Sequence, residues 1–372
     1  MVEENRSNCP YSNEVVNLDR REFIFKKLPL FLAYLLAGHQ INRVALDPLN
    51  IVLDQNSVKF TPARLGLTIN FRNFGWYDLD RNEALQQLLA LPVEHVRIPI
   101  PFDIVERQKG QFDFSTTDEV VQKAKEHKKT IHFQFGAKTA AGKEVNLPEW
   151  LLDEMPELNK PGPLDIHPKF REYTMEYLEQ SASRYLPKVE GRGAIYVENE
   201  GHNRRLPLTN YRYITQPFHR EEVALVKTID PFRRPIIQNI PDTIGETFTL
   251  LKRDDIDIVG FNIYDQAEFF NLPIPKSIYK EGYWAGVKFL ARLVEFFGKQ
   301  RDIPERQSNY WLNGAKEPVY PFSIEKFLEG MLRLQNIMPE AIVFLWDVEQ
   351  RLWRAKYHGG VDQIEELEAL TF

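Results

Sequence analysis

Short apolar runs alternate with amphipathic stretches along most of this chain, and that alternation constrains the fold more than any other feature. Most of the runs are continuously apolar, as expected of parallel strands that are covered on both faces. Eight of them predict strands, at 64–71, 95–100, 130–136, 193–200, 234–239, 257–264, 308–314 and 341–349. Between them, apolar residues recur every three or four positions, which predicts helices. These helices are expected at 82–91, 117–128, 170–185, 219–229, 246–253, 284–297, 324–337 and 362–370.

Eight strands, each followed by a helix, predict a (β/α)8 TIM barrel, with a doubly wound open sheet as the structural alternative. A barrel of this kind needs about 250 residues plus insertions, and the chain has 372. No linker rich in Pro, Gly or Ser interrupts the chain after residue 60. We therefore expect a single barrel over residues 62–372, preceded by an N-terminal extension over residues 1–61.

The extension contains a segment with two interpretations. In residues 19–38, two pairs of basic residues precede the apolar run 28–38, which is too short to span a bilayer. The arrangement resembles a twin-arginine export signal, and it equally suits a helix that packs on the barrel. No small-x-small cleavage site follows, which favours the packed helix and a cytoplasmic location over export or membrane tethering. Residues 51–60 then predict a β-hairpin.

Composition excludes several classes of function. The formal net charge is −6, so the chain lacks the basic surface of a nucleic-acid-binding protein. Cys9 is the only cysteine, which excludes an intramolecular disulfide and a cysteine-based zinc site. The sequence contains neither a His-x-x-x-His pair nor a glycine-rich phosphate loop. We expect no cofactor and no metal.

Polar residues cluster where the predicted strands end, and in a (β/α)8 barrel the carboxyl ends of the strands carry the chemistry. They combine carboxylates, amides and aromatic rings, a mixture that suits a sugar: rings for the pyranose face, amides for hydroxyls, and carboxylates for acid/base work at the anomeric centre. The set is Arg97, Asp103, Gln134, Lys138, Glu198, Asn199, Glu200, Gln238, Asn239, Tyr264, Asp265, Glu268, Asn313, Glu317, Trp346, Asp347 and Glu349. The expected partner is an oligosaccharide or polysaccharide.

Three stretches resemble clan A glycoside hydrolases, the retaining β-glycosidases on (β/α)8 barrels that include cellulases and β-galactosidases. They are "HVRIPIPFDIVERQKGQFDFS" from residue 95, "VENE" from residue 197 and "AIVFLWDVEQRLW" from residue 341. The resemblance runs in register from about residue 64 to about residue 357. Each stretch is moderately specific, whereas their order and spacing together are strongly specific.

The resemblance implies a role for each matching residue. Glu200 is the expected general acid/base, and Asn199 is expected to hold the sugar 2-hydroxyl. Arg97 is expected to orient the nucleophile, Tyr264 to line the site, and Trp346 to form the floor of a sugar subsite. Together with Gln134 and Glu349, which lie at the ends of predicted strands, the expected substrate-binding residues are Arg97, Gln134, Asn199, Tyr264, Trp346 and Glu349.

The pattern at the end of the fourth strand agrees with an acid/base role for Glu200. Glu198 and Glu200 are two positions apart, so we predict that both point to one side of the strand and Asn199 to the other. A carboxylic acid beside a second carboxylate in an apolar enclosure has a raised pKa, which keeps its proton in place near neutrality.

The expected catalytic partner is missing from the sequence. A retaining glycosidase needs a second carboxylate about 5–5.5 Å from the acid, at the end of strand seven. When "YWLNGAKEPVY" from residue 310 is aligned on Glu317-Pro318, the nucleophile position falls on Asn313. An amide oxygen is a much weaker nucleophile than a carboxylate. We therefore predict a barrel that binds a β-linked glycan and hydrolyses it weakly or not at all.

The sequence is also compatible with several alternatives for the missing catalytic partner and for the function of the barrel. Glu317 could occupy the nucleophile's place and give an active retaining enzyme. Glu268 or Glu349 could instead act as a base at the longer separation that inverting enzymes use, roughly 6.5–9.5 Å. The Asn313 amide could assist a substrate that carries its own nucleophile. In the remaining alternative the barrel is a non-catalytic scaffold associated with the cell envelope.

Overall fold

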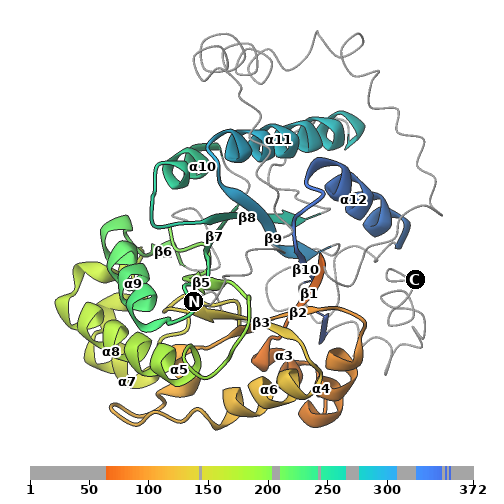
Figure 1. Cartoon of the computed structure of the whole chain (residues 1–372). Coiled ribbons are helices and arrows are strands. Elements are labelled where there is room, and N and C mark those ends of the chain that lie inside the picture. The colour runs from red at the N-terminus through yellow and green to blue at the C-terminus, as the bar shows by residue number, and fades with distance from the viewer. Residues whose placement is uncertain are drawn as a thin grey trace, which may run out of the picture. The chain divides into compact units, whose positions relative to one another are not determined.

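The computed structural model describes residues 64–141, 145–202, 210–241, 244–264, 276–307, 324–345, 348, 349 and 352 (Figure 1). All of them belong to one compact unit, Asp54–Phe372. The extension 1–61, with its expected helix and hairpin, and the expected helix 362–370 lie outside the described residues. Those expectations, and the domain boundary at residues 61 and 62, stay predictions.

Eight parallel strands close into a barrel, which confirms the predicted fold and excludes the open sheet. The strands are β1 (Leu65–Thr68), β2 (His95–Pro99), β3 (Thr130–Phe135), β5 (Ile195–Val197), β7 (Ile236–Pro241), β8 (Ile258–Tyr264), β9 (Gln300–Gln307) and β10 (Val343–Leu345). β1 pairs with both β2 and β10, so the barrel sheet has no open edge. A separate two-stranded sheet joins β4 (Gly162–Pro163) to β6 (Arg212–Tyr213).

Helices surround the barrel (Figure 1). They are α3 (Phe71–Trp76), α4 (Arg81–Ala90), α5 (Phe102–Val105), α6 (Ser115–Glu126), α7 (Glu149–Glu154), α8 (Pro168–Tyr185), α9 (Gln216–Ile229), α10 (Ile244–Leu251), α11 (Lys276–Phe296) and α12 (Ile324–Ile337). The seven helices predicted between residues 82 and 337 are present, and short helices at 71–76, 102–105 and 149–154 were not predicted. α4 begins with a side-chain cap, in which the Asp80 carboxylate accepts the Glu83 N–H at 2.8 Å. α11 begins at Lys276 rather than at residue 284. Across the described ranges, no helix is both long and apolar enough to span a bilayer.

The expectation for the seventh strand was wrong. That strand is β9 (Gln300–Gln307), whereas the expected segment 308–314 lies outside the described residues. The sequence pattern does not identify this strand. Its charged side chains interrupt the apolar pattern, and Pro304 cannot donate a hydrogen bond to a strand ladder. The ladder accommodates the proline with a register shift: Gly260 pairs with Asp302, whereas Asn262 pairs with Glu305. Such a bulge is one of the few places where a strand tolerates proline.

Side chains near the amino ends of the strands fill the barrel interior. The ring centroids of His132 and Phe344 lie 4.9 Å apart, and those of His95 and His132 lie 5.1 Å apart. Because His132 Nδ1 accepts the Ala194 N–H at 3.0 Å, its Nε2 carries the proton and donates it to His95 Nδ1 at 3.0 Å. Burial lowers the pKa of His132 well below its usual value of 6.5. The barrel core therefore holds neutral imidazoles.

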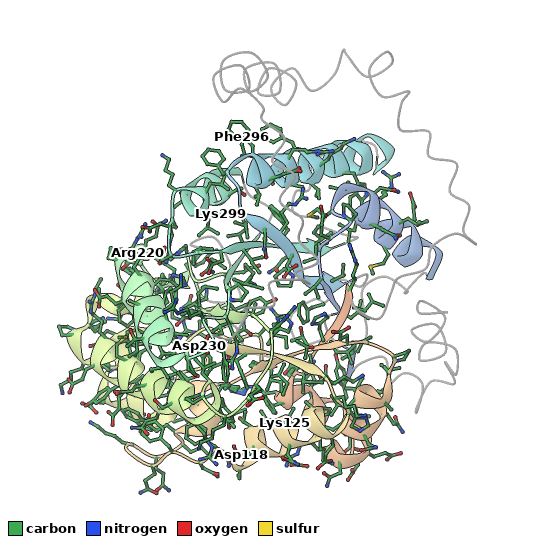
Figure 2. All side chains as sticks on the ribbon, viewed as in Figure 1. Asp118, Lys125, Arg220, Asp230, Phe296 and Lys299 are labelled. Carbon is green, nitrogen blue, oxygen red and sulfur yellow. The ribbon has the colours of Figure 1, made fainter. Side chains whose placement is uncertain are left out.

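Charged side chains lie on the helices outside the barrel. Asp118 and Lys125 of α6 are labelled at this outer layer in Figure 2. Asp118 forms an ion pair with Arg184 of α8 and accepts a hydrogen bond from the Tyr185 hydroxyl at 2.9 Å. These contacts join neighbouring helices across the outer surface.

Gly193 offers a test of how tightly the strands approach one another. A Cβ at this position would collide with the backbone carbonyl oxygen of Ile131 in β3, which cannot move without disturbing the barrel. We expect Gly193→Ala to lower the free energy of unfolding by about 1–3 kcal/mol, the usual range for overpacking. Urea denaturation measures the change.

Gly286→Ala is the matched control. A Cβ at Gly286 meets nothing within 4 Å, and the residue lies inside α11. Alanine is favoured over glycine in a helix by about 0.5–1 kcal/mol, so this variant should be more stable. Equal stability of the two variants would contradict the close approach at Gly193.

Candidate active site at the carboxyl ends of the strands

The backbone reverses the expected arrangement of side chains at the end of β5. Glu198 (φ 63°) and Glu200 (φ 45°) both lie in the left-handed region. The Glu198 carboxylate turns to the loop after β3 and accepts the N–H groups of Ala137 at 2.7 Å and Lys138 at 2.6 Å. Glu200 Oε1 instead accepts a hydrogen bond from Asn262 Nδ2 in β8 at 2.6 Å. The prediction that the two carboxylates share one side is therefore wrong, because the regular pleat ends at Val197.

Four amides around Glu200 form a continuous hydrogen-bonded group, here called the amide cluster: Gln134, Asn199, Asn239 and Asn262. Asn199 Oδ1 accepts from Gln134 Nε2 at 3.2 Å and from Asn239 Nδ2 at 2.7 Å. The Glu200 N–H donates to Asn239 Oδ1 at 3.2 Å. The cluster spans β3, β7, β8 and the end of β5, and all four members are buried. Both the main chain and the carboxylate of Glu200 are thus held by amides from neighbouring strands.

A buried cation lies in β2. Arg97 is fully buried, and its Nε donates to Thr68 Oγ1 of β1 at 3.0 Å. Its guanidinium lies over the ring of Tyr196 in β5, at 5.2 Å from the centroid. An aromatic face attracts a guanidinium at this distance. These contacts fix a positive charge inside the barrel, in a strand next to β3 of the amide cluster.

The structure brings several of the predicted residues together. Gln134, Asn199 and Glu200 meet in or beside the amide cluster. Glu349 is buried after β10, where it accepts the Asn70 N–H at 2.6 Å. Only the backbone of Tyr264 is described, at the end of β8. Outside the described residues lie Glu268, Asn313, Glu317 and Trp346.

Asn262 is the member of the site that the sequence analysis did not single out. It is the one amide in the strand segment "IVGFNIY" of β8. A buried amide in an apolar strand requires hydrogen-bond partners, so an isolated polar residue of this kind is the signal that could have identified it.

β9 contributes two acidic residues at different levels of the barrel. Asp302 is buried and accepts the Ile342 N–H at 2.9 Å, just before β10 begins, and burial raises its pKa to about 7. Glu305 comes later in the strand, and its backbone pairs with Asn262. Of these two acidic residues, Glu305 is therefore the one nearer to the carboxyl end of β9. It is in register with Asn262, the residue whose amide holds Glu200.

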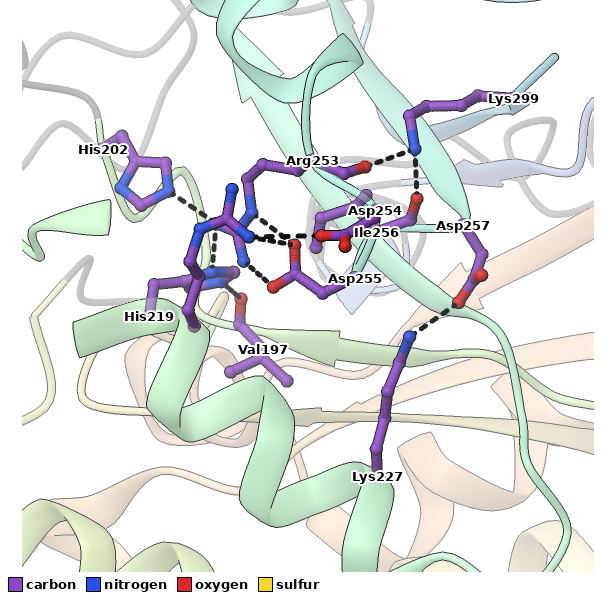
Figure 3. Close-up of polar contacts among 11 residues, drawn as sticks. Val197, His202, His219, Lys227, Arg253, Asp254, Asp255, Ile256, Asp257 and Lys299 are labelled. Carbon is purple, nitrogen blue, oxygen red and sulfur yellow. Dashed lines mark hydrogen bonds and ion pairs between the residues drawn. The ribbon is translucent and has the colours of Figure 1, made fainter. Parts of the chain in front are cut away.

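A second polar cluster supports the turn that carries Glu200 (Figure 3). Arg253 Nη1 donates to His219 Nδ1 at 2.7 Å and to His202 Nε2 at 3.3 Å. His219 in turn donates from Nε2 to the Val197 carbonyl at 2.8 Å, and His202 donates from Nδ1 to the Ile214 carbonyl at 2.9 Å. Both imidazoles are therefore neutral hydrogen-bond acceptors for Arg253. Together they fix the chain immediately before and after residues 198–200.

Within the described part of the chain, no three His, Cys, Asp or Glu side chains are grouped so that they could hold a metal ion.

Solved structures of several glycoside hydrolases are similar to this chain. A β-galactosidase from the haloarchaeon Halorubrum lacusprofundi matches with a TM-score of 0.54 at 14% identity, over 76% of this chain and 52% of that one. An exo-β-1,4-mannosidase from Opitutaceae bacterium strain TAV5 matches with a TM-score of 0.57 at 11% identity, over 83% and 60%. A β-galactosidase from Rahnella sp. R3 matches with a TM-score of 0.57 at 12% identity, over 84% and 56%.

The shared feature is the TIM-barrel fold. This chain spans between 52% and 60% of the length of the three enzymes. Neither the comparison with protein-family models nor the comparison with curated proteins finds a match. The comparisons thus support the barrel fold, in which the candidate site occupies the carboxyl ends of the strands.

His219 makes the stability of this region dependent on pH. Burial lowers its pKa well below 6.5, since a second ring proton would also face Arg253. The unfolded chain takes up that proton below about pH 6.5, so the stability contributed by neutral His219 is lost as the pH falls. Each such group contributes at most about 1.4 kcal/mol per pH unit. We expect His219→Gln to lose less stability than the unaltered protein between about pH 7 and about pH 5.

Urea denaturation across this pH range measures the effect, with His127→Gln as the control. His127 lies at the C-terminal end of α6 and takes no part in the Arg253 contacts. An identical loss of stability in the His219 variant and in the unaltered protein would contradict a neutral His219.

Proposed function

We propose that this protein is a retaining β-glycosidase whose general acid/base is Glu200. The observation that carries the proposal is the fixation of Glu200 at the end of β5 by Asn239 and Asn262. The residue is only 7% exposed, so it is largely withdrawn from water. A carboxyl group held in this way at the carboxyl end of a barrel strand suits proton transfer to a glycosidic oxygen.

Glu305 is the proposed nucleophile. The clan A resemblance requires a carboxylate at the end of strand seven, and strand seven is β9 rather than residues 308–314. Glu305 is the later of the two acidic residues in β9, and its backbone is in register with Asn262. This assignment replaces Asn313, whose proposed role depended on the earlier position of the strand.

The proposed reaction has two steps. In the first, the Glu305 carboxylate attacks the anomeric carbon while Glu200 donates its proton to the departing glycosidic oxygen, which leaves a glycosyl ester on Glu305. In the second, Glu200 removes a proton from water, the water oxygen attacks the anomeric carbon, and the Glu305 carboxylate is released. The carboxyl groups in such enzymes lie about 5–5.5 Å apart.

Substrate binding is assigned to the remaining residues of the predicted set. Asn199 and Gln134 belong to the amide cluster, which suits hydrogen bonding to sugar hydroxyls. Arg97 supplies a fixed positive charge inside the barrel. Tyr264, Trp346 and Glu349 keep the substrate-binding roles that the resemblance implies. The names of the similar structures make β-galactosides and β-mannosides the first substrates to test.

Leaving-group dependence separates the two proposed roles. A 2,4-dinitrophenolate leaves without a proton, whereas a phenolate benefits from general acid help worth about 10²–10⁴-fold. We expect Glu200→Gln to lose that factor in kcat/KM with phenyl β-glycosides and to keep most of its kcat/KM with dinitrophenyl β-glycosides, because kcat/KM reports the first step. Its kcat should fall with the dinitrophenyl substrate, because the second step still needs Glu200 as the base. Glu305→Gln should lose turnover with both. Steady-state kinetics measures each effect, with the exposed Glu340→Gln as the control.

Full activity in Glu305→Gln would rule out Glu305 as the nucleophile. Glycan binding without turnover in the unaltered protein would instead favour the weakly active interpretation, in which Asn313 occupies the nucleophile position. Asn313→Glu should then raise the activity sharply.

Azide provides an independent test of the nucleophile. In Glu305→Ala the small anion can take the place of the missing carboxylate and attack the anomeric carbon directly. We expect added azide to restore turnover of dinitrophenyl β-glycosides and to give the α-glycosyl azide, since a single displacement inverts the configuration. NMR of the product identifies the anomer. A β-glycosyl azide from this variant would show that another residue is the nucleophile.

A further inference from the structure

Glu198 and Glu222 form a fully buried, hydrogen-bonded pair of carboxyl groups at the turn that carries Glu200. Glu198 directly follows β5 and Glu222 lies in α9, and neither residue has exposed surface. Isolated carboxylates at such sites are strongly disfavoured, because burial removes their hydration. Two adjacent carboxylates are disfavoured further by their mutual repulsion.

The hydrogen bonds show which member of the pair is ionised. Glu198 accepts two backbone N–H groups, from Ala137 and Lys138, and such donors stabilise a carboxylate. Among the described residues, no N–H or O–H group donates to either oxygen of Glu222. Glu222 therefore carries the proton and donates it to Glu198, which is consistent with a Glu222 pKa raised well above 4.5 by burial and by the Glu198 charge.

Hydrogen bonds between the loop after β3 and the turn after β5 connect this pair to Glu200. The Asn199 N–H donates to the Lys138 carbonyl at 2.6 Å, and the Glu198 N–H donates to the Phe135 carbonyl at 2.8 Å. Lys138 Nζ donates to the Glu200 carbonyl at 2.8 Å. The loop after β3 and the turn after β5 are thus joined, and the Glu198 carboxylate supplies two of the joining contacts.

Gly136 leaves the space that the Glu198 carboxylate occupies. Its φ is +123°, and a Cβ there would collide with the Glu198 carboxylate. Only glycine adopts such a backbone conformation readily, and here it also provides the space for the carboxylate.

We propose that Glu198 and Glu222 are positioning residues: a carboxylate and a carboxylic acid that share one proton and hold the Glu200 turn in place. The catalytic part of this inference rests on the proposed function, whereas the contacts it describes do not. When the shared proton is lost, two buried charges face one another and the joined turns separate. The result is a loss of activity at alkaline pH that does not arise from Glu200 itself.

The pH direction follows from the charges that face the pair. Burial raises the pKa of Glu198, and the nearby Lys138 lowers it by a smaller amount. Asp165 and Glu221 both raise the pKa of Glu222, and Tyr177 of α8 lies close enough to Glu198 for the carboxylate to raise the pKa of the phenol. Groups with raised carboxyl pKa values stabilise the fold at low pH and lose that contribution as the pH rises. The pair therefore loosens on the alkaline side.

Glu222→Gln tests the shared proton. The glutamine keeps an N–H donor for Glu198 and has no proton to lose, so the turns should stay joined at every pH. The measurement is the hydrogen-exchange protection of the Ala137 and Lys138 amides from about pH 6 to about pH 10, corrected for intrinsic exchange. We expect protection to fall at least about tenfold with rising pH in the unaltered protein and to stay constant in Glu222→Gln. Glu340→Gln, at an exposed position that is not among the charges acting on Glu222, should behave as the unaltered protein.

Glu198→Gln tests the positioning role. Its amide cannot accept both backbone N–H groups, so protection at Ala137 and Lys138 should fall at all pH values. Turnover should fall about 10–100-fold in kcat with little change in KM, as expected when a catalytic group is displaced by about 1 Å. Glu222→Gln should keep the activity and lose the alkaline decline.

Two outcomes would overturn the inference: unchanged amide protection in Glu198→Gln, or a pH dependence in Glu222→Gln that equals that of the unaltered protein. If the unaltered protein has no glycosidase activity, the proposed function fails, and the amide protection still decides whether the pair joins the turns.

Discussion

The candidate site depends on a strained turn in which Glu198 and Glu200 both have left-handed backbone conformations. Such conformations at non-glycine residues cost about 1–3 kcal/mol each and persist only where surrounding contacts enforce them. Here the contacts come from three directions. His219 holds the Val197 carbonyl, the loop after β3 holds the Glu198 carboxylate, and Asn239 holds the Glu200 N–H. As a result, the carboxylates of Glu198 and Glu200 lie in different surroundings, whereas a regular strand would place both on the same side.

The sequence predicts the barrel because its strands are apolar along their whole length and its helices keep a regular period. The prediction fails at the seventh strand, whose sequence lacks this apolar pattern. "QRDIPERQ" contains four charged residues and a proline, and no pattern of side chains marks it as a strand. This segment is a strand because of its neighbour β8, since Gly260 leaves space for Pro304 and the ladder shifts its register there. That contact joins residues far apart in the sequence.

The site was predictable to the extent that it follows from strand ends. Gln134, Asn199 and Glu200 were identified in this way, because parallel strands bring their carboxyl ends together. The partner of Glu198 could not be identified, because Glu222 lies in a helix where an acidic residue predicts a solvated face. Nor does side-chain alternation apply beyond Val197, where the left-handed turn begins. Local patterns therefore locate the site, whereas long-range hydrogen bonds determine its internal arrangement.

The different surroundings of Glu198 and Glu200 assign them different chemistry. Two backbone N–H groups bind the oxygens of Glu198, and those bonds favour its ionised form. Glu200 Oε1 is held by the neutral amide of Asn262. An amide N–H can donate to a carboxylate oxygen and equally to the carbonyl oxygen of a protonated carboxyl group. Glu200 can therefore release and regain a proton without losing its anchor, as the proposed general acid/base must do once in each catalytic cycle, whereas Glu198 is suited to hold the turn that presents it.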